Sequence, residues 1–395
     1  MKTHRLLLIL IVFLFVSSSL FSQHRGIYPA DYSTEEYFPL LATKKLGIVA
    51  NHSARLNNTH LIDTLLSAKM SIVKIFAPEH GFRGKAGYGE EIKDETDPKT
   101  GIPLISLFGK NKKPSIVQLK GIDLMVYDIQ DVGVRFYTYI STLHYVMEAC
   151  AEAEIPLMIL DRPNPLGDYF DGPVLKSDFR SFVGMHPIPV VYGLTVGELA
   201  LMINEEGWLD GEKKCKLTII KMPGYYHQYA YQIPEAPSPS LPNDLSIRLY
   251  ASLCFFEGTD FSVGRGTDKA FQVIGYPNPI FGEYSFTPET SSGSIKPIHQ
   301  DKKCFGSDLS KTSRKETFSL KYLLQYHQLS KGKITFITRP DFFDKLAGTN
   351  ELREQIMNNW SEDKIRESWN KDLEAYRILR AHYLLYPEKI QECHH

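Results

Sequence analysis

Residues 71–84 read SIVKIFAPEHGFRG and join a run of apolar residues to a dense polar motif. The run SIVKIFA (71–77) has the length and the β-branched content of a buried strand. Pro78 and Gly81 then break the strand, and Glu79 and His80 lie between them. In parallel α/β sheets, strands are buried on both faces and ligands bind outside their carboxyl ends. The stretch therefore predicts such a strand, with a carboxylate at its carboxyl end.

The same alternation of apolar runs and helical stretches extends to both sides of this motif. Thr195 and Glu198 have the spacing of a capping box at the start of one predicted helix. The other predicted strands are LGIVA (46–50), GIDLMVYDI (121–129), PLMILD (156–161), IPVVYG (188–193) and CKLTIIKM (215–222), and the predicted helices span 59–68, 141–153 and 195–208. We predict an α/β fold with a Rossmann-like, doubly wound, mostly parallel sheet.

The length of 395 residues exceeds what one hydrophobic core usually supports, so two domains are expected. The composition changes at residues 223–246, which are rich in Pro, Tyr and Ser. We predict a Rossmann-like N-terminal domain over 23–225 and a smaller C-terminal α/β domain over 226–395. The second is expected to contain a helix around 246–256, a strand at KITFITR (333–339) and charged helices to the end.

Residues 1–22 have the pattern of a secretory signal peptide. Basic residues precede an apolar run at 6–16, which is short for a membrane span, and small residues lead to a cleavage position near Ser22. We expect a secreted, periplasmic protein without a membrane partner after cleavage; a retained membrane anchor is the alternative. The formal net charge of -1 does not favour nucleic acid as a partner. The five cysteines are scattered without a CxxC pair, which argues against a disulfide framework.

Polar residues follow four of the predicted strands. Since the carboxyl ends of parallel strands meet at one edge of a sheet, we expect these residues to form one site. They are Asn51, His52 and Ser53; Glu79 and His80; Asp128 and Asp131 with Arg135 and Tyr137; and Asp161, Arg162 and Asn164.

Carboxylates dominate this group, and such a set suits glycosidic bond hydrolysis. One carboxylic acid must protonate the leaving oxygen, and a second group must support the transition state or activate water. Arg135 and Arg162 would lower the pKa of a paired carboxylate, whereas burial would raise that of an unpaired one. Asp161 and Arg162 could equally form an ion pair that only orients loops.

The stretch EGTDFSVGRGTDKAF (257–271) is a second dense motif, with Glu257, Arg265 and Thr267 among glycines. Its glycines would let the backbone approach a ligand closely. The proline-rich PSPSLPND (237–244), which includes Ser238, would shape a cleft. A turn system at a domain junction is the other interpretation.

Several cofactor motifs are absent from the sequence. No GxGxxG, GxxxxGK[ST], HExxH or GxSxG occurs, so neither a nucleotide cofactor nor a metal is expected. A metal-dependent hydrolase or deacetylase of cell-wall sugars that uses His52, His80, Asp128 and Asp131 remains an alternative. A non-catalytic periplasmic sugar-binding protein is another. Oligomeric state is open.

The ordered motifs resemble those of the exo-β-N-acetylmuramidases of the NamZ type, secreted glycoside hydrolases once known only as a domain of unknown function. The motifs are NHS (51–53), FAPEHGFRG (76–84), YDIQDVGVRFYTY (127–139), LDRPNPLG (160–167), YGLTVGELA (192–200), PSPSLP (237–242), FEGTDFSVGRGT (256–267) and FDKLAGT (343–349). The resemblance implies an active site in the cleft between two domains. It also implies metal-free release of terminal N-acetylmuramic acid from the non-reducing end of peptidoglycan-derived saccharides.

The resemblance also assigns roles to individual residues. Glu79 falls on the leading catalytic candidate, and Glu257 is a second catalytic or a substrate-binding residue; Asp128 and Asp131 remain possible catalytic partners. Arg265 would meet the lactyl carboxylate of muramic acid, because a guanidinium binds a carboxylate bidentately. Tyr192 stands where many relatives have histidine. The expected substrate-binding residues are Asn51, His52, His80, Arg135, Tyr137, Asp161, Arg162, Asn164, Tyr192, Ser238, Arg265 and Thr267.

Overall fold

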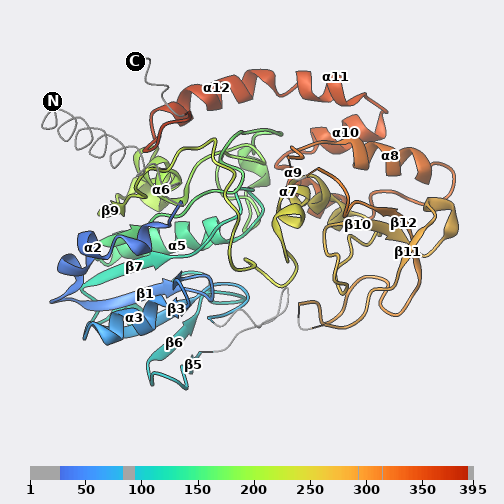
Figure 1. Cartoon of the computed structure of the whole chain (residues 1–395). Coiled ribbons are helices and arrows are strands. Elements are labelled where there is room, and N and C mark those ends of the chain that lie inside the picture. The colour runs from blue at the N-terminus through green and yellow to red at the C-terminus, as the bar shows by residue number, and fades with distance from the viewer. Residues whose placement is uncertain (1–26, 83–93, 292, 314, 390–395) are drawn as a thin grey trace, which may run out of the picture.

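The computed structural model describes residues 27–82, 94–291, 293–313 and 315–389 (Figure 1). A seven-stranded sheet has the order β5-β6-β4-β1-β7-β8-β9. Its strands are β1 Lys45–Ala50, β4 Ser71–Ala77, β5 Glu95–Thr96, β6 Pro103–Ser106, β7 Leu124–Asp128, β8 Leu157–Leu160 and β9 Leu217–Ile220. The pairing is parallel except between β5 and β6. Numbered along the chain, the six parallel strands follow the doubly wound order 3-2-1-4-5-6, so the predicted fold class is confirmed.

The central strands are buried on both faces, as their continuous apolar sequence predicts. Successive side chains alternate between two apolar cores: Ile48 and Ile75 belong to one, and Val49 and Phe76 to the other. Helices α2 (Thr34–Leu41) and α3 (Leu61–Ser67) pack in the first core, and α5 (Tyr139–Glu152) and α6 (Val196–Glu205) in the second. Short α4 (Ile116–Leu119) precedes β7.

The register of the sheet aligns the ends of three strands. Val49 of β1 is paired with Phe76 of β4 and with Tyr127 of β7. The loops after β1, β4 and β7 therefore leave the sheet at the same edge, side by side. The loop after β7 runs to Thr138, the N-cap of α5. This edge carries the polar residues that follow β1, β4 and β7 in the sequence.

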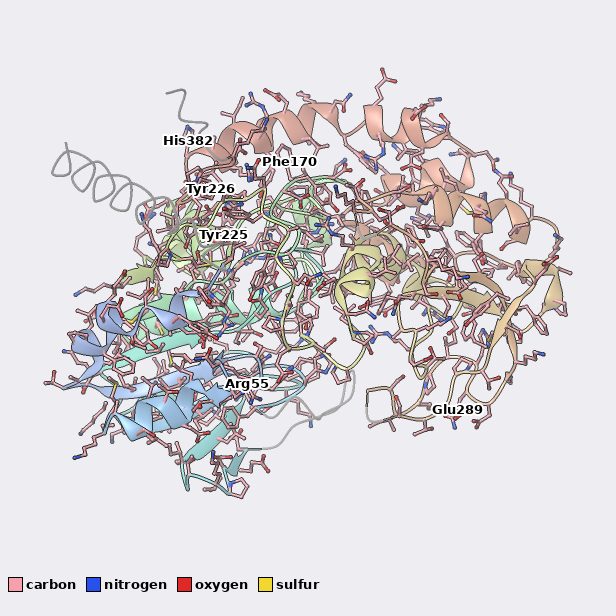
Figure 2. All side chains as sticks on the ribbon, viewed as in Figure 1. Arg55, Phe170, Tyr225, Tyr226, Glu289 and His382 are labelled. Carbon is pink, nitrogen blue, oxygen red and sulfur yellow. The ribbon has the colours of Figure 1, made fainter. Side chains whose placement is uncertain are left out.

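The C-terminal part contains a three-stranded antiparallel sheet and six helices among the described residues. Its strands, in the order β10-β12-β11, are β10 Val273–Tyr276, β12 Cys304–Asp308 and β11 Tyr284–Phe286. The helices are α7 Asp244–Leu253, α8 Lys321–Ser330, α9 Pro340–Ala347, α10 Glu351–Met357, α11 Glu362–Glu367 and α12 Asn370–Ala381. Figure 1 shows α11 and α12 running from this part back over the first. Under α12, Phe170 packs against Tyr376 (Figure 2).

Two predicted strands are wrong. Residues 188–193 contain only an isolated bridge residue, Val191, which faces Val134 and Asp171. Residues 333–339 likewise form one bridge, between Ile337 and Thr259. Residues 188–193 are apolar because they are buried in a loop, whereas in 333–339 only Phe336 and Ile337 are buried. A short apolar stretch signals burial without fixing the backbone conformation.

The other predicted strands and helices are confirmed, including the capping box of α6. There the Thr195 hydroxyl accepts from the Glu198 N–H at 3.2 Å, and the Glu198 carboxylate accepts from the Thr195 N–H at 2.8 Å. The domain boundary at 225/226 stays a prediction. No helix in the described ranges is long and apolar enough to cross a bilayer.

Candidate active site

One pocket joins the strand ends of the large sheet to the C-terminal part. Its polar lining residues are Glu79, His80, Tyr137, Thr138, Ser238, Ser240, Glu257 and Arg265. Its apolar wall includes Phe136, Tyr250, Phe271 and Phe342. The pocket brings together six residues that the sequence singled out: Glu79, His80, Tyr137, Ser238, Glu257 and Arg265.

Glu79 reaches the pocket through a tight turn at the end of β4. The Gly81 N–H donates to the Pro78 carbonyl at 3.0 Å, and His80 and Gly81 both have left-handed backbones, with φ of 69° and 73°. A non-glycine residue with positive φ is strained, so surrounding contacts must hold His80 in place. The turn leaves Glu79 only 7% exposed.

The Glu79 carboxylate is held by a residue from another strand end. The Thr138 hydroxyl donates to Glu79 Oε2 at 2.8 Å, although Thr138 is the N-cap of α5 and caps no backbone N–H of that helix. The next residue, Tyr139, has its hydroxyl 3.0 Å from Asn51 Nδ2 and 3.4 Å from the Glu79 carbonyl. The loops after β1, β4 and β7 thus meet around Glu79.

Glu257 and Arg265 form an ion pair on the side of the pocket that the C-terminal part contributes. Arg265 Nε and Nη2 lie 2.8 and 2.7 Å from Glu257 Oε1, and Nη1 donates to the Ser240 hydroxyl at 2.7 Å. The guanidinium also lies 4.9 Å from the centre of the Phe271 ring, within cation–π range. Both charged groups are therefore fixed in position.

The glycines around Arg265 serve the turn itself. Gly264 has φ of 80°, and a side chain there would meet Val273 and the Lys269 carbonyl at 2.6 and 2.7 Å. Gly266, with φ of 82°, is equally close to the Glu289 carbonyl. The space that these glycines leave is filled by the protein, which corrects the expectation that it admits a ligand.

The proline-rich loop forms the wall between the two sides. The Pro237 carbonyl accepts from the hydroxyls of Tyr137 at 2.9 Å and Tyr139 at 3.2 Å. One residue earlier, the Ala236 carbonyl lies 2.7 Å from His52 Nε2. His52 and Tyr137 thus position this loop.

Comparison with protein-family models identifies the family of this chain. Residues 46–245 match the model described as exo-β-N-acetylmuramidase NamZ, N-terminal, and residues 248–386 match its C-terminal counterpart. The chain belongs to the NamZ family. It is 37% identical to the peptidoglycan β-N-acetylmuramidase NamZ of Bacillus subtilis (strain 168), over 89% of both chains.

Solved structures of relatives have the same fold as this NamZ chain. Two DUF1343 family proteins from Bacteroides fragilis NCTC 9343 match with TM-scores of 0.84 and 0.80, at 43% and 29% identity. Each match covers 92% of this chain and 100% of the other. The pocket draws on both NamZ regions, since Glu79 and Ser238 belong to the first and Glu257 and Arg265 to the second.

Asp128 and Arg162 lie outside the lining of this pocket and form a buried ion cluster. Arg162 Nε is 2.5 Å from Asp128 Oδ1, and Nη2 is 2.6 Å from Asp31 Oδ2. Burial raises the pKa of Asp31 to about 7, although the positive charge of Arg162 lowers it. This is the ion-pair interpretation that the sequence left open for Arg162, with Asp128 as its partner in place of Asp161.

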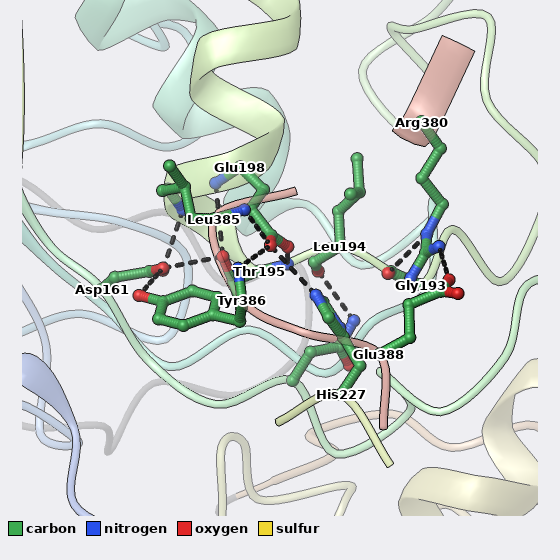
Figure 3. A network of polar contacts seen from close by, with 12 residues as sticks. Asp161, Gly193, Leu194, Thr195, Glu198, His227, Arg380, Leu385, Tyr386 and Glu388 are labelled. Carbon is green, nitrogen blue, oxygen red and sulfur yellow. Dashed lines mark hydrogen bonds and ion pairs between the residues drawn. The ribbon is translucent and has the colours of Figure 1, made fainter. Parts of the chain in front are cut away.

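Asp161 instead anchors the start of α6 and the C-terminal segment of the NamZ chain (Figure 3). It accepts from the Thr195 hydroxyl at 2.7 Å, the Gly197 N–H at 2.8 Å and the Tyr386 hydroxyl at 2.7 Å. Burial raises the pKa of Asp161 to about 6. Glu198, in the first turn of α6, accepts from the Leu385 N–H at 2.8 Å.

Asp131 and Tyr192 hydrogen-bond to each other behind the pocket. The Tyr192 hydroxyl donates to Asp131 Oδ2, which also accepts from the Gly133 N–H at 2.8 Å. Burial raises the pKa of Asp131 to about 6. Tyr192 therefore places a phenol hydroxyl on the Asp131 carboxylate.

The remaining selected residues support the backbone. Arg135 donates to four carbonyls, of which Leu346 and Ala347 end α9, and burial lowers its pKa to about 9. Asn164 donates to the Leu194 carbonyl at 2.8 Å, and Thr267 to that of Gly264 at 2.7 Å. These contacts are within the protein, so the substrate-binding roles of these residues stay predictions.

Sequence reasoning missed Thr138, Ser240, Tyr250 and Phe271 as lining residues. Thr138 lies beside Tyr137, and Ser240 lies two residues after Ser238. Their closeness in sequence to these predicted site residues was the signal that could have identified them. Phe271 ends the glycine-rich motif at 257–271, and Tyr250 occurs in an apolar stretch that looks like ordinary core. In the described part of the chain, no three His, Cys, Asp or Glu side chains come together as a metal site.

Proposed function

We propose that this protein is an exo-acting glycoside hydrolase that releases N-acetylmuramic acid from the non-reducing end of peptidoglycan-derived saccharides. Membership of the NamZ family, with a Bacillus subtilis relative that is a peptidoglycan β-N-acetylmuramidase, carries this proposal. The pocket supports it chemically, because Glu79 and Glu257 both line it. Glycoside hydrolysis uses such a pair of carboxyl groups.

Glu79 is the general acid of the proposed mechanism. It protonates the glycosidic oxygen as the bond to the sugar breaks, and then takes a proton from the incoming water. The hydrogen bond from Thr138 fixes the orientation of its carboxyl group. A proton donor held in position accelerates the reaction far more than a mobile one, because the reacting atoms must be aligned within hydrogen-bond distance.

Glu257 is the better of the remaining candidates for the partner role. Asp128 is bound to Arg162, and Asp131 to Tyr192 and Gly133, whereas Glu257 lines the pocket itself. Arg265 fixes Glu257 where its charge would support positive charge that develops on the sugar ring. Arg265 is also the candidate group for the lactyl carboxylate, and the hydroxyls of Ser238 and Ser240 lie nearby in the same pocket.

A pair of chromogenic substrates tests the activity. The purified protein should hydrolyse a β-N-acetylmuraminide and leave the matching β-N-acetylglucosaminide intact, because the two differ only in the lactyl group. Full activity in EDTA would remove the metal-dependent alternative, and activity lost on chelation would support it. Saturable binding of the muraminide without turnover would identify a sugar-binding protein instead.

We also propose that residues 1–22 are a signal peptide and that the mature protein acts in the periplasm. These residues lie outside the described ranges, and the proposal rests on their sequence. Periplasmic extraction followed by N-terminal sequencing should give a chain that begins near Gln23. A chain that retains Met1 in the membrane fraction would support the anchor.

A further inference from the structure

A second pocket lies beside the β2–β3 hairpin that follows β1, where β2 is Arg55–Leu56 and β3 is Thr59–His60. Arg55, which marks this hairpin in Figure 2, lines the pocket together with Tyr28, Tyr32, Asn57, Tyr231 and Glu235. Ser53 and Arg162, which follow β1 and β8, form its floor. The pocket thus lies at the carboxyl edge of the sheet, where doubly wound folds bind ligands.

The cationic side chains of this pocket are already matched by carboxylates. Arg55 Nη1 lies 3.3 Å from Glu235 Oε1, and Arg162 is paired with Asp31 and Asp128. An anionic ligand would find no net positive charge here, because three carboxylates face the two guanidinium groups. The electrostatics therefore favour a neutral ligand over a phosphate or a carboxylate.

The rest of the lining combines aromatic faces with hydrogen-bonding groups. The rings of Tyr28 and Tyr32 lie 5.0 Å apart, and Tyr28 is 52% exposed. The Tyr32 hydroxyl accepts from the Asn57 N–H at 2.6 Å, which fixes the ring beside the hairpin. Apolar faces with a few oriented polar groups suit a pyranose, which has apolar ring faces and a polar rim.

One loop connects this pocket to the candidate active site. Tyr231 and Glu235 line the second pocket, and Ser238 and Ser240 line the first. Only Ala236 and Pro237 lie between Glu235 and Ser238, so the two walls lie within roughly 10 Å of chain. The loop between them is held on both sides, by His52 at Ala236 and by Tyr137 at Pro237.

We infer that the second pocket is a distal subsite for a neutral N-acetylhexosamine unit of the same saccharide. The inference rests on the proposed function: an exo-acting enzyme holds the terminal sugar in the first pocket, so the chain can extend only on the aglycone side. The subsite then sets a preference for longer saccharides.

Tyr28→Ala tests the subsite. We expect kcat/KM for a muramyl-terminated tetrasaccharide to fall about tenfold, the equivalent of about 1.4 kcal/mol. The value for the chromogenic monosaccharide should stay within twofold. Tyr226→Ala is the matched control, because Tyr226 forms a similar ring pair with Tyr229, at 5.5 Å, and lines neither pocket. Equal effects of Tyr28→Ala on both substrates, or none on the tetrasaccharide, would overturn the inference.

A binding measurement separates this inference from the proposed function. A neutral N-acetylglucosamine tetramer should bind the wild-type protein in a calorimetric titration, and Tyr28→Ala should weaken that binding about tenfold. If the wild type fails on the muraminide but shows Tyr28-dependent binding, the proposed function fails and the subsite stands. If it cleaves the muraminide and the tetramer binds equally to both proteins, the subsite fails alone.

Discussion

The hydroxyl of Thr138 lies 2.8 Å from Oε2 of Glu79, and this contact joins the start of α5 to the end of β4. Two strands that are neighbours of β1 thereby define the position of one carboxylate. The contact makes the proposed general acid depend on a residue that is 59 positions away in the chain.

Glu79→Gln should reduce the release of N-acetylmuramic acid at least a hundredfold, because positioned acid–base catalysis contributes about 10²–10⁴-fold. Steady-state kinetics with the chromogenic muraminide measures this, and a thermal melt checks the fold. Glu289→Gln is the control, since Glu289 is exposed (Figure 2). Retention of more than about a tenth of the rate would refute the role of Glu79.

Thr138→Val should lower kcat about tenfold and leave the melting temperature nearly unchanged. The lost hydrogen bond to the Glu79 carboxyl is worth up to about 1.5 kcal/mol, and the Thr138 side chain caps no backbone group of α5. Thr138→Ser keeps the hydroxyl and should restore the rate. If serine and valine are equally slow, the methyl group matters and the hydrogen bond does not.

Arg265→Ala should narrow the preference for muraminide over glucosaminide by roughly 10–100-fold, as a lost charge-assisted bond of about 1.5–3 kcal/mol implies. The ratio of kcat/KM for the two substrates measures this. Arg377→Ala, which removes a comparable pair with Glu374 on the exposed face of α12, is the control. An unchanged ratio would show that the lactyl group is read elsewhere.

Arg162→Gln should destabilise the protein far more than Asp128→Asn. Removing the guanidinium leaves Asp31 and Asp128 buried without a counter-charge, a loss of about 3–5 kcal/mol. Removing Asp128 leaves a matched pair. Urea unfolding gives the order, and kinetics on folded Asp128→Asn should stay within a few-fold of wild type. A hundredfold loss there would return Asp128 to the catalytic list.

Asp131 should make stability depend on pH between about 4 and 7. Burial raises its pKa from 3.8 to about 6, so the folded state binds this proton more tightly than the unfolded state. The contribution is complete below pH 3.8 and is lost as the pH rises through 6. Asp131→Asn does not titrate and keeps the same stability as the pH rises, whereas the wild type loses this contribution. The free energy of unfolding of the variant minus that of wild type should therefore increase by up to about 3 kcal/mol from pH 4 to pH 7. If the free energies of unfolding of the two proteins change in parallel with pH, the raised pKa of Asp131 is contradicted.

The sheet could be predicted from sequence because its strands are buried on both faces. LGIVA is a continuous apolar run, and SIVKIFA is an apolar run interrupted by Lys74; both are bounded by turn residues and match observed strands. IPVVYG has the same composition but lies in a loop beneath α12, where Tyr376 donates to the Tyr192 carbonyl at 2.6 Å. Burial shapes the composition of both kinds of segment, so composition could not separate them.

The candidate site was only partly predictable for a related reason. A strand end predicts which residues reach the edge of the sheet, and that argument selected Glu79 correctly as a pocket residue. It cannot tell a carboxylate that faces the pocket from one that holds the fold. Asp161 lies at a strand end too, but it receives the hydroxyl of Tyr386, 225 positions later, and no local pattern encodes that contact.

The hydrogen bonds from Leu385 to Glu198 of α6 and from Tyr386 to Asp161 after β8 constrain the order in which the protein folds. Tyr386 packs in the same core as Leu46 and Ile75 of the first strands. A nascent chain that has exposed everything up to α11 still lacks this piece of its earliest-made core. The core of the N-terminal part is therefore complete only once Tyr386 has been made and has docked, so its stability depends on a contact between segments far apart in the sequence.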